Sequence, residues 1–232
     1  MLNDLTQSVF FGAVLTLGAY EIGLACKKKW RLAIFNPLLI AIILVVSALA
    51  LLKIPYDTYQ SGAKYISYLL TPATVCLAVP LYEQLSLLKK NALAIFAGII
   101  AGVLTSVTLV LLFAAAFHFS HSEYVTFLPK SVTTAIGMGV SERLGGNVPI
   151  TVVVIIITGV LGNILAEPVC KILAITHPIA KGIGIGSASH AIGTAKAMEL
   201  GQVEGAMSGL SIAVSGILTV FAAAVFAALY GG

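Results

Sequence analysis

The sequence predicts an all-α, polytopic integral membrane protein with internal repeats and broken or re-entrant helices. Three observations lead to this prediction: the composition, the long apolar stretches and a repeat of 57 residues. Apolar residues make up 59% of the 232 residues, charged residues make up 9%, and the mean hydropathy is +1.05. A soluble domain usually carries about a quarter charged residues. A chain this small could not bury so much apolar surface, which excludes a water-soluble enzyme.

Charge and cysteine content exclude further classes. The net charge of +4 is small, and the basic residues lie in loops, so the sequence predicts no nucleic-acid partner. The three cysteines (Cys26, Cys76 and Cys170) are far apart and lack metal-ligand spacing. They predict neither a disulfide framework nor a metal site.

Apolar stretches define the expected membrane segments, because a crossing helix needs roughly 20 mostly apolar residues. Five stretches meet this requirement: Leu5–Ala25, Leu32–Leu52, Ala92–Phe117, Val148–Ala166 and Gly205–Leu229. Three shorter and more polar stretches lie between them: Tyr65–Leu81, Pro129–Val140 and Gly182–Leu200. We therefore expect one domain over residues 1–232, with two spanning helices in 1–60 and three repeats in 61–232.

Basic residues give the expected orientation. The densest cluster covers residues 27–31, directly after the first span, and Lys89 and Lys90 form the second. Basic loops favour the cytoplasm, so we expect a multi-pass protein of the bacterial cytoplasmic membrane with its N-terminus outside. Whether Pro129–Val140 and Gly182–Leu200 cross the membrane or re-enter it stays open, because the charge count favours re-entry only slightly.

A repeat organises the second part of the chain. Gly102, Gly159 and Gly216 are each followed by similar residues and are 57 residues apart. Residues 74–80 align with 131–137 at the same spacing, and 131–137 align with 187–193 at a spacing of 56. Each unit is thus a broken polar segment followed by a long apolar helix.

The broken segments indicate a polar site within the membrane. Proline and glycine interrupt helical hydrogen bonds, and lipid cannot satisfy the freed backbone groups. Secondary transporters use such discontinuous helices to bind anions at mid-depth. The alternative is that the glycines only allow close helix packing. That alternative explains the glycines of the long helices better than it explains the hydroxyl, lysine and histidine residues of the short segments.

Lys130 is the most informative residue of the second broken segment. A lysine at the bilayer centre costs about 3 kcal/mol or more, so it is rare and is usually paired or functional. Its ammonium group would attract a carboxylate, together with the hydroxyl groups of Ser131, Thr133 and Thr134. The equally supported alternative is a lysine that extends to the aqueous boundary.

Asn163 and Glu167 lie four residues apart and hence on one helix face. Asn163 is a candidate hydrogen-bonding partner of the substrate or of a neighbouring helix. Glu167 could take up a coupling proton or pair with Lys130. Because it precedes Pro168 at the expected helix end, an interfacial position is slightly favoured.

The third and first broken segments complete the candidate site. His190 could carry a coupling proton, because histidine titrates near physiological pH, but a structural histidine is at least as well supported. Lys196 is expected to be neutralised by Glu199. The remaining substrate-binding candidates are hydroxyl residues: Thr71, Thr74, Ser187, Ser189 and Thr194.

No catalytic arrangement is predicted. Ser189 and His190 are sequence neighbours, which is not the geometry of a nucleophile and its base. The sequence has neither a Walker A motif nor a dinucleotide-binding glycine turn. We expect no enzyme activity and no cofactor, and any uphill transport would draw on an ion or proton gradient.

Four runs resemble the LrgB/CidB family of bacterial membrane proteins over essentially the whole chain. They are LLTPATVCLAVPLYEQ (69–84), LPKSVTTAIGMGVSERLGG (128–146), GNILAEP (162–168) and GIGIGSASHAIGTAKAMELG (182–201). The resemblance implies two accounts of function. One is an antiholin-like modulator of murein hydrolase activity and autolysis, acting with a smaller LrgA/CidA-type membrane protein. The other is transport, since a similar domain forms part of the plant plastid glycolate/glycerate translocator and bacterial relatives are linked to pyruvate uptake.

The residue pattern favours the transport account. A broken-helix site with Lys130 and several hydroxyl groups suits a small monocarboxylate, such as a 2-oxo or 2-hydroxy acid. A lytic pore would not need such segments. The expected partners are a small carboxylate, the lipid bilayer, an LrgA/CidA-type protein and a second copy of the chain in a homodimer.

Overall fold

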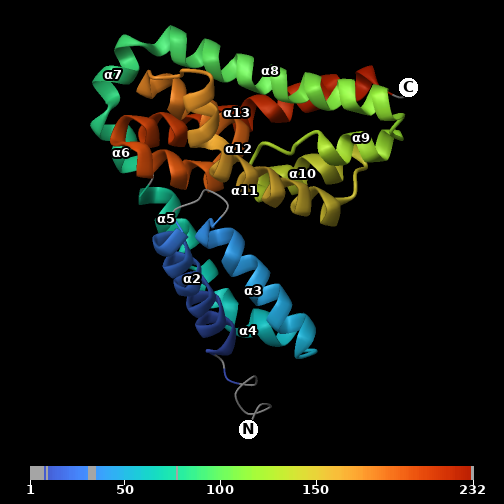
Figure 1. The fold of residues 1–232 in the computed structure, drawn as a ribbon. Helices are drawn as coiled ribbons and strands as arrows, with labels where there is room; N and C mark the ends of the chain where they lie inside the picture. The colour runs from blue at the N-terminus through green and yellow to red at the C-terminus, as the bar shows by residue number, and fades with distance from the viewer. Residues whose placement is uncertain (1–7, 9, 31–34, 77, 231–232) are drawn as a thin grey trace. The chain divides into compact units, whose positions relative to one another are not determined.

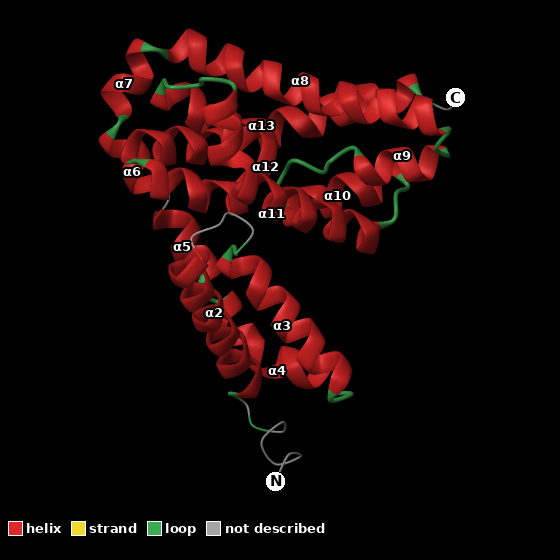
Figure 2. Ribbon diagram, viewed as in Figure 1, coloured by secondary structure: helices red, strands yellow, loops and turns green. Residues whose placement is uncertain are grey.

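The computed structural model describes residues 8, 10–30, 35–76 and 78–230, and at residues 70, 71, 74 and 78 it describes the backbone alone. Within these residues every regular element is a helix, as Figure 2 shows, which confirms the predicted all-α class. The chain divides into two compact units, Met1–Cys76 and Leu77–Gly232.

The first unit contains four described helices: α2 (Phe11–Trp30), α3 (Pro37–Leu51), α4 (Tyr56–Ser67) and α5 (Leu70–Cys76). Asn36 caps α3, because its side-chain oxygen accepts hydrogen bonds from the amides of Leu38 and Leu39. The described helix is therefore 15 residues long and starts later than the predicted span Leu32–Leu52. Part of that span, and the start of Leu5–Ala25, lie outside the described residues.

The second unit begins with two short helices, α6 (Ala78–Glu83) and α7 (Leu85–Lys90), followed by α8 (Ala92–Phe117), α9 (His121–Phe127) and α10 (Thr134–Leu144). It ends with α11 (Val148–Ile172), α12 (Pro178–Leu200) and α13 (Gln202–Leu229). In the described chain, α8, α11 and α13 are the helices long and apolar enough to cross a membrane. The first matches its predicted range, and the third starts three residues earlier than predicted.

The predicted end of α11 at Ala166 is wrong. The helix runs through Pro168 to Ile172, because a proline inside a helix removes one hydrogen bond without preventing later turns. Asn147 begins the helix by accepting a hydrogen bond from the Ile150 amide through its side chain.

Helices α9 and α10 form a helical hairpin with a turn at residues 128–133, here called the first hairpin. Its base is closed by a hydrogen bond from Ser122 Oγ to the Gly145 carbonyl, at 3.0 Å. His121 Nδ1 lies 2.7 Å from the Tyr230 carbonyl oxygen, so the base lies where α13 ends. In Figure 1 this hairpin adjoins the C-terminal ends of α8 and α13.

A capping box begins α9. The Ser120 amide and hydroxyl both donate to the Glu123 carboxylate, at 2.7 and 2.8 Å. These bonds, led by that of the Ser120 amide, hold the pKa of Glu123 below its usual value. The hairpin therefore has a defined starting point at the end of the unit.

The residues of α12 also form a hairpin. Ser189 and His190 have non-helical backbone angles. A Cβ atom on Gly193 would lie 3.2 Å from the Ile185 side chain. Eight residues along a straight helix would separate these positions by about 12 Å. Residues 178–188 and 191–200 are therefore two antiparallel arms, here called the second hairpin.

The second hairpin enters from the opposite end of the unit. A Cβ on Gly182, in the first arm, would lie against Glu204 and Met207 in the first turns of α13. Met198, in the second arm, similarly packs against Gly205. Both polar segments of the second unit therefore fold back on themselves, as the re-entrant alternative would require, and their topology in a membrane stays a prediction.

Two apolar clusters hold the ends of the unit together. One includes Val107, Tyr124 and Ala223, where the first hairpin meets α8 and α13. The other includes Ile99 and Met207, where the second hairpin meets the beginnings of the same helices. Each hairpin is thus anchored at its own end, and both tips lie between the ends.

Candidate functional site

The tip of the first hairpin carries the lysine singled out by the sequence. Lys130 is half-buried in the turn, and its Nζ donates a hydrogen bond to Ser131 Oγ at 2.9 Å. The Ser131 hydroxyl, only 6% exposed, lies 3.0 Å from that of Ser106 on α8. Ser106 is close to the middle of this 26-residue helix. The turn that carries Lys130 is therefore fixed near mid-depth of a predicted membrane span.

The two threonines that follow Lys130 open α10. Thr133 is the N-cap residue, and its side chain makes no capping hydrogen bond. Thr134 is the first residue of the helix, and both side chains are partly exposed. The first amides of a helix have no partner within it, so this end offers hydrogen-bond donors beside the lysine.

The tip of the second hairpin is closed and strained. Ser189 and His190 are 2% and 3% exposed. His190 has a positive φ of 43°, a conformation that costs a residue other than glycine about 1–3 kcal/mol. Its Nε2 donates a hydrogen bond to the Ile155 carbonyl of α11, at 3.0 Å. This contact and the surrounding packing hold the tip in its shape.

The hydroxyl groups of the second hairpin bond to its own backbone. Ser187 donates to the Ile183 carbonyl at 2.7 Å, and Ser189 donates to the Ile185 carbonyl at 2.8 Å. Thr194 lies 3.0 Å from the His190 carbonyl and 2.7 Å from the Ser208 hydroxyl on α13. These bonds favour a structural role for the three hydroxyl residues predicted as substrate ligands.

Both tips contact the same two helices. On α8, Ser106 contacts the first hairpin, and Gly102, one turn away, approaches Ser187 of the second. On α11, the Ile155 side chain packs against Gly137 of the first hairpin, and its carbonyl accepts the His190 bond. The two breaks in the helices therefore lie at one depth within the unit.

The repeated glycines explain how the hairpin backbones approach the spans. Gly102, Gly159 and Gly216 lie near the middles of α8, α11 and α13. A Cβ on Gly159 would lie 2.9 Å from Ile192, and one on Gly216 would lie 2.8 Å from Ile136. Close packing is thus the role of the repeated glycines, as the alternative interpretation of the sequence proposed.

The electrostatics of the mid-depth region favour an anion. Helix α10 and the second arm of α12 both begin at a tip, and a helix N-terminus carries roughly half a positive charge. Lys130, when protonated, adds a positive charge. No aspartate follows Asp57 in the sequence. The glutamates of the unit lie near helix ends: Glu83, Glu123, Glu142, Glu167, Glu199 and Glu204.

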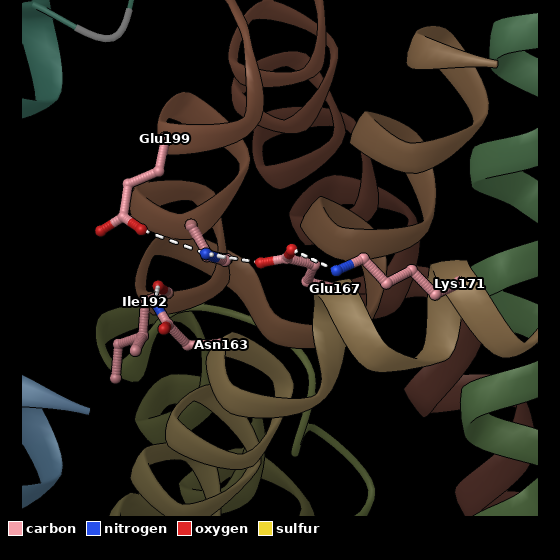
Figure 3. A network of polar contacts seen from close by, with 6 residues as sticks. Asn163, Glu167, Lys171, Ile192 and Glu199 are labelled. Atoms are coloured by element: carbon pink, nitrogen blue, oxygen red, sulfur yellow. Dashed lines mark hydrogen bonds and ion pairs between the residues drawn. The ribbon is translucent and has the colours of Figure 1, made fainter. Parts of the chain in front are cut away.

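Asn163 and Glu167 fasten the second arm of α12 to α11 (Figure 3). Asn163 Nδ2 donates to the Ile192 carbonyl at 2.7 Å. The Glu167 carboxylate pairs with Lys171 at 2.9 Å and with Lys196 at 3.1 Å. Its partners are thus not Lys130, which corrects one of the two predicted roles. Lys196 also pairs with Glu199 at 3.2 Å, as predicted.

Thr71 and Thr74 lie on α5 of the first unit, and their side chains lie outside the described residues. The predicted contribution of the first broken segment therefore stays a prediction.

Sequence reasoning missed Ser106 and a buried cluster under the first hairpin. Thr151 Oγ1 lies 2.9 Å from the Thr126 carbonyl and 2.7 Å from Ser141 Oγ, and the Asn147 amide donates to Thr126 Oγ1. Ser106 lies four residues after Gly102, and residues four apart share a helix face. This spacing could have predicted that Ser106 faces the hairpins together with Gly102.

A family model described as the LrgB-like family matches residues 16–229. This chain belongs to that family. The match covers both units of this LrgB-like protein and confirms the resemblance drawn from its polar segments.

Relatives of similar length carry one name. An "Antiholin-like protein LrgB" of Bacillus subtilis (strain 168) is 37% identical over 228 residues, covering 98% of this chain and 99% of the relative. Proteins of the same name from Bacillus mycoides (strain KBAB4) and Bacillus cereus (strain B4264) are 36% identical over 227 residues, covering 97% of this chain and 99% of each relative. No solved structure matches this LrgB-like chain. Together with the three apolar helices, these relatives identify a bacterial membrane protein.

Proposed function

We propose that this protein is a secondary carrier of small monocarboxylates, such as pyruvate or glycolate, with its substrate site at the tip of the first hairpin. The observation that carries the proposal is Lys130 on a helix break held at mid-depth by Ser131 and Ser106. A lysine at this depth is costly unless it is paired or has a function, and its ammonium group donates a hydrogen bond to the neutral hydroxyl of Ser131.

The surroundings of Lys130 support a monovalent carboxylate as the substrate. Two helix N-termini start at the tips, and together with the lysine they favour a single negative charge. Ser131, Thr133 and Thr134 offer hydroxyl groups for the oxo or hydroxy oxygen of the substrate. In this proposal Lys130 binds the carboxylate, and the hydroxyl groups select the 2-oxo or 2-hydroxy position.

Uphill transport in this proposal is proton-coupled. Glu167 is about 40% exposed at its side chain and pairs with two lysines. His190 is buried at a hairpin tip and contacts α11. The group that carries the coupling proton must respond to substrate binding. The position of His190 at a hairpin tip therefore favours it over Glu167 for this role.

A second candidate is an antiholin-like modulator of murein hydrolase activity that acts with an LrgA/CidA-type partner. The names of the Bacillus relatives favour it, and they support it more directly than they support transport. In this account the chain acts through protein contacts, and Lys130 would serve the fold.

Reconstitution into liposomes distinguishes the two candidates. We expect saturable uptake of labelled pyruvate or glycolate under an inward proton gradient. Lys130→Gln should reduce uptake by about tenfold or more, since tenfold corresponds to only about 1.4 kcal/mol of binding. Lys90→Gln, at the exposed end of α7, is the matched control and should transport normally.

Two outcomes would contradict the carrier. One is an absence of uptake with and without the LrgA/CidA-type partner. The other is release of dyes of many sizes without saturation, which is the behaviour of a pore. The modulator would be supported if the protein changed murein hydrolase activity in cells and the Lys130→Gln variant changed it to the same extent.

A further inference from the structure

A cavity of about 280 Å³ lies between α11 and the first arm of α12. Its walls are mainly apolar or small residues, among them Gly162, Gly184 and Ala188. Among the described residues that line it, Lys181 alone carries a charge. This cavity is separate from the turn that carries Lys130, because no residue of the first hairpin lines it.

The length of the cavity is close to the thickness of one bilayer leaflet. Along α12 it extends from Lys181, in the first turn, to Ser189, at the tip of the second hairpin. Eight residues of helix rise by about 12 Å. Along α11 it extends from Cys170, near the end of a predicted membrane span, to Gly162, close to the middle of that span. Half of a hydrocarbon core of about 30 Å is similar in length.

The apolar walls of the cavity favour an apolar occupant. A water-soluble ion would find almost no polar partners along the cavity, whereas an acyl chain needs none. Lys181 is partly exposed in the first turn of α12, at the end of the cavity away from the hairpin tip. A basic residue at the mouth of a cavity between membrane helices complements an anionic headgroup.

We propose that this cavity binds one acyl chain of an anionic phospholipid, with its headgroup phosphate at Lys181. The chain would lie between Ala166 on α11 and Gly184 and Ala188 on α12. Its end would reach Ser189, next to His190 at the tip of the second hairpin. The lipid would thus pack against the first arm of the second hairpin, which α11 covers only in part.

Gly184 provides a substitution that fills the cavity without disturbing the backbone. A Cβ atom at this position would have no heavy atom within 4 Å, so a leucine side chain has room there. Gly18, on α2, has equally open surroundings and lies in the first unit. Gly184→Leu and Gly18→Leu therefore form a matched pair, in which both introduce the same side chain into a helix.

Native mass spectrometry of the purified full chain tests the proposal, with phosphatidylglycerol and phosphatidylcholine as probes. We expect the wild type and Gly18→Leu to retain one phosphatidylglycerol, and Gly184→Leu to retain about tenfold less. Lys181→Gln should still bind lipid but lose the preference for phosphatidylglycerol. Equal retention by the wild type and Gly184→Leu, or no headgroup preference in the wild type, would overturn the proposal.

Cys170 gives an independent measurement within the cavity. In a variant with Cys26→Ser and Cys76→Ser, it is the remaining thiol of the chain. Phosphatidylglycerol should slow the reaction of Cys170 with a maleimide severalfold, and Gly184→Leu should abolish this protection. Ala188→Leu, which fills the same cavity, replaces Gly184→Leu if that variant does not fold. Protection that instead rises with protein concentration in lipid-free detergent would show that a second copy covers the cavity, and would refute the lipid site. None of these measurements depends on transport.

Discussion

The two hairpins of the second unit reach the same depth from opposite ends, but their tips are built differently. The first tip holds Lys130 on one neutral hydroxyl partner and leaves two threonines partly exposed. The second tip buries His190 and directs its hydroxyl groups to its own backbone. This difference indicates that the first tip leaves polar groups available to a ligand, whereas the hydroxyl groups of the second tip serve its own fold.

The largest expected effect comes from the packing of the second hairpin. A Cβ on Gly186 would clash with the Ser208 backbone, so Gly186→Val should cost about 3 kcal/mol or more and reduce the yield of folded protein. Gly184→Val, two residues away on the same arm, has open space and should fold. Thermal unfolding in detergent measures both. Equal stabilities of the two variants would remove the argument for a rigid second hairpin.

A smaller effect is expected at the strained tip. His190→Ala removes the hydrogen bond to Ile155 and should cost about 1–3 kcal/mol of unfolding free energy. His190→Gly removes the same bond but accepts the positive φ, so it should be more stable than His190→Ala by about 1 kcal/mol. The order of their midpoints in chemical denaturation tests this. The reverse order would mean that the backbone at residue 190 stores no strain.

The smallest pair of effects compares one threonine from each hairpin. Thr194→Val preserves shape but removes two buried hydrogen bonds, and should cost about 1–2 kcal/mol. Thr133→Val removes a hydroxyl that makes no capping bond, and should stay within about 0.5 kcal/mol of the wild type. Unfolding free energies from the same denaturant series give both values. A larger loss for Thr133→Val would assign the first tip a structural role as well.

The sequence predicted much of this architecture because breaks in helices have local causes. Pro129 and the hydroxyl residues after it predicted the first break, and the long apolar stretches predicted the three long helices around it. The second break was located only approximately. Gly182 and Gly186 pack against α13, and the chain reverses at Ser189 and His190 instead.

The roles of individual site residues were harder to predict, because they depend on partners distant in sequence. Asn163 bonds to a carbonyl 29 residues away, and Glu167 pairs with Lys196 on another helix. The hydroxyl groups of Ser187 and Thr194 were expected to face a ligand, but they bond to backbone within their own hairpin. The sequence shows that such polar groups lie within apolar segments. Packing decides which of them remain able to bind a ligand.

The geometry of the 57-residue repeat has a consequence for how the molecule arose. In each of the last two repeats a hairpin precedes one long helix, and the two hairpins enter from opposite ends of the second unit. Duplication of one such segment is therefore enough to give two hairpins of opposite direction. Divergence of the two copies then accounts for the different tips, a lysine at one and a buried histidine at the other.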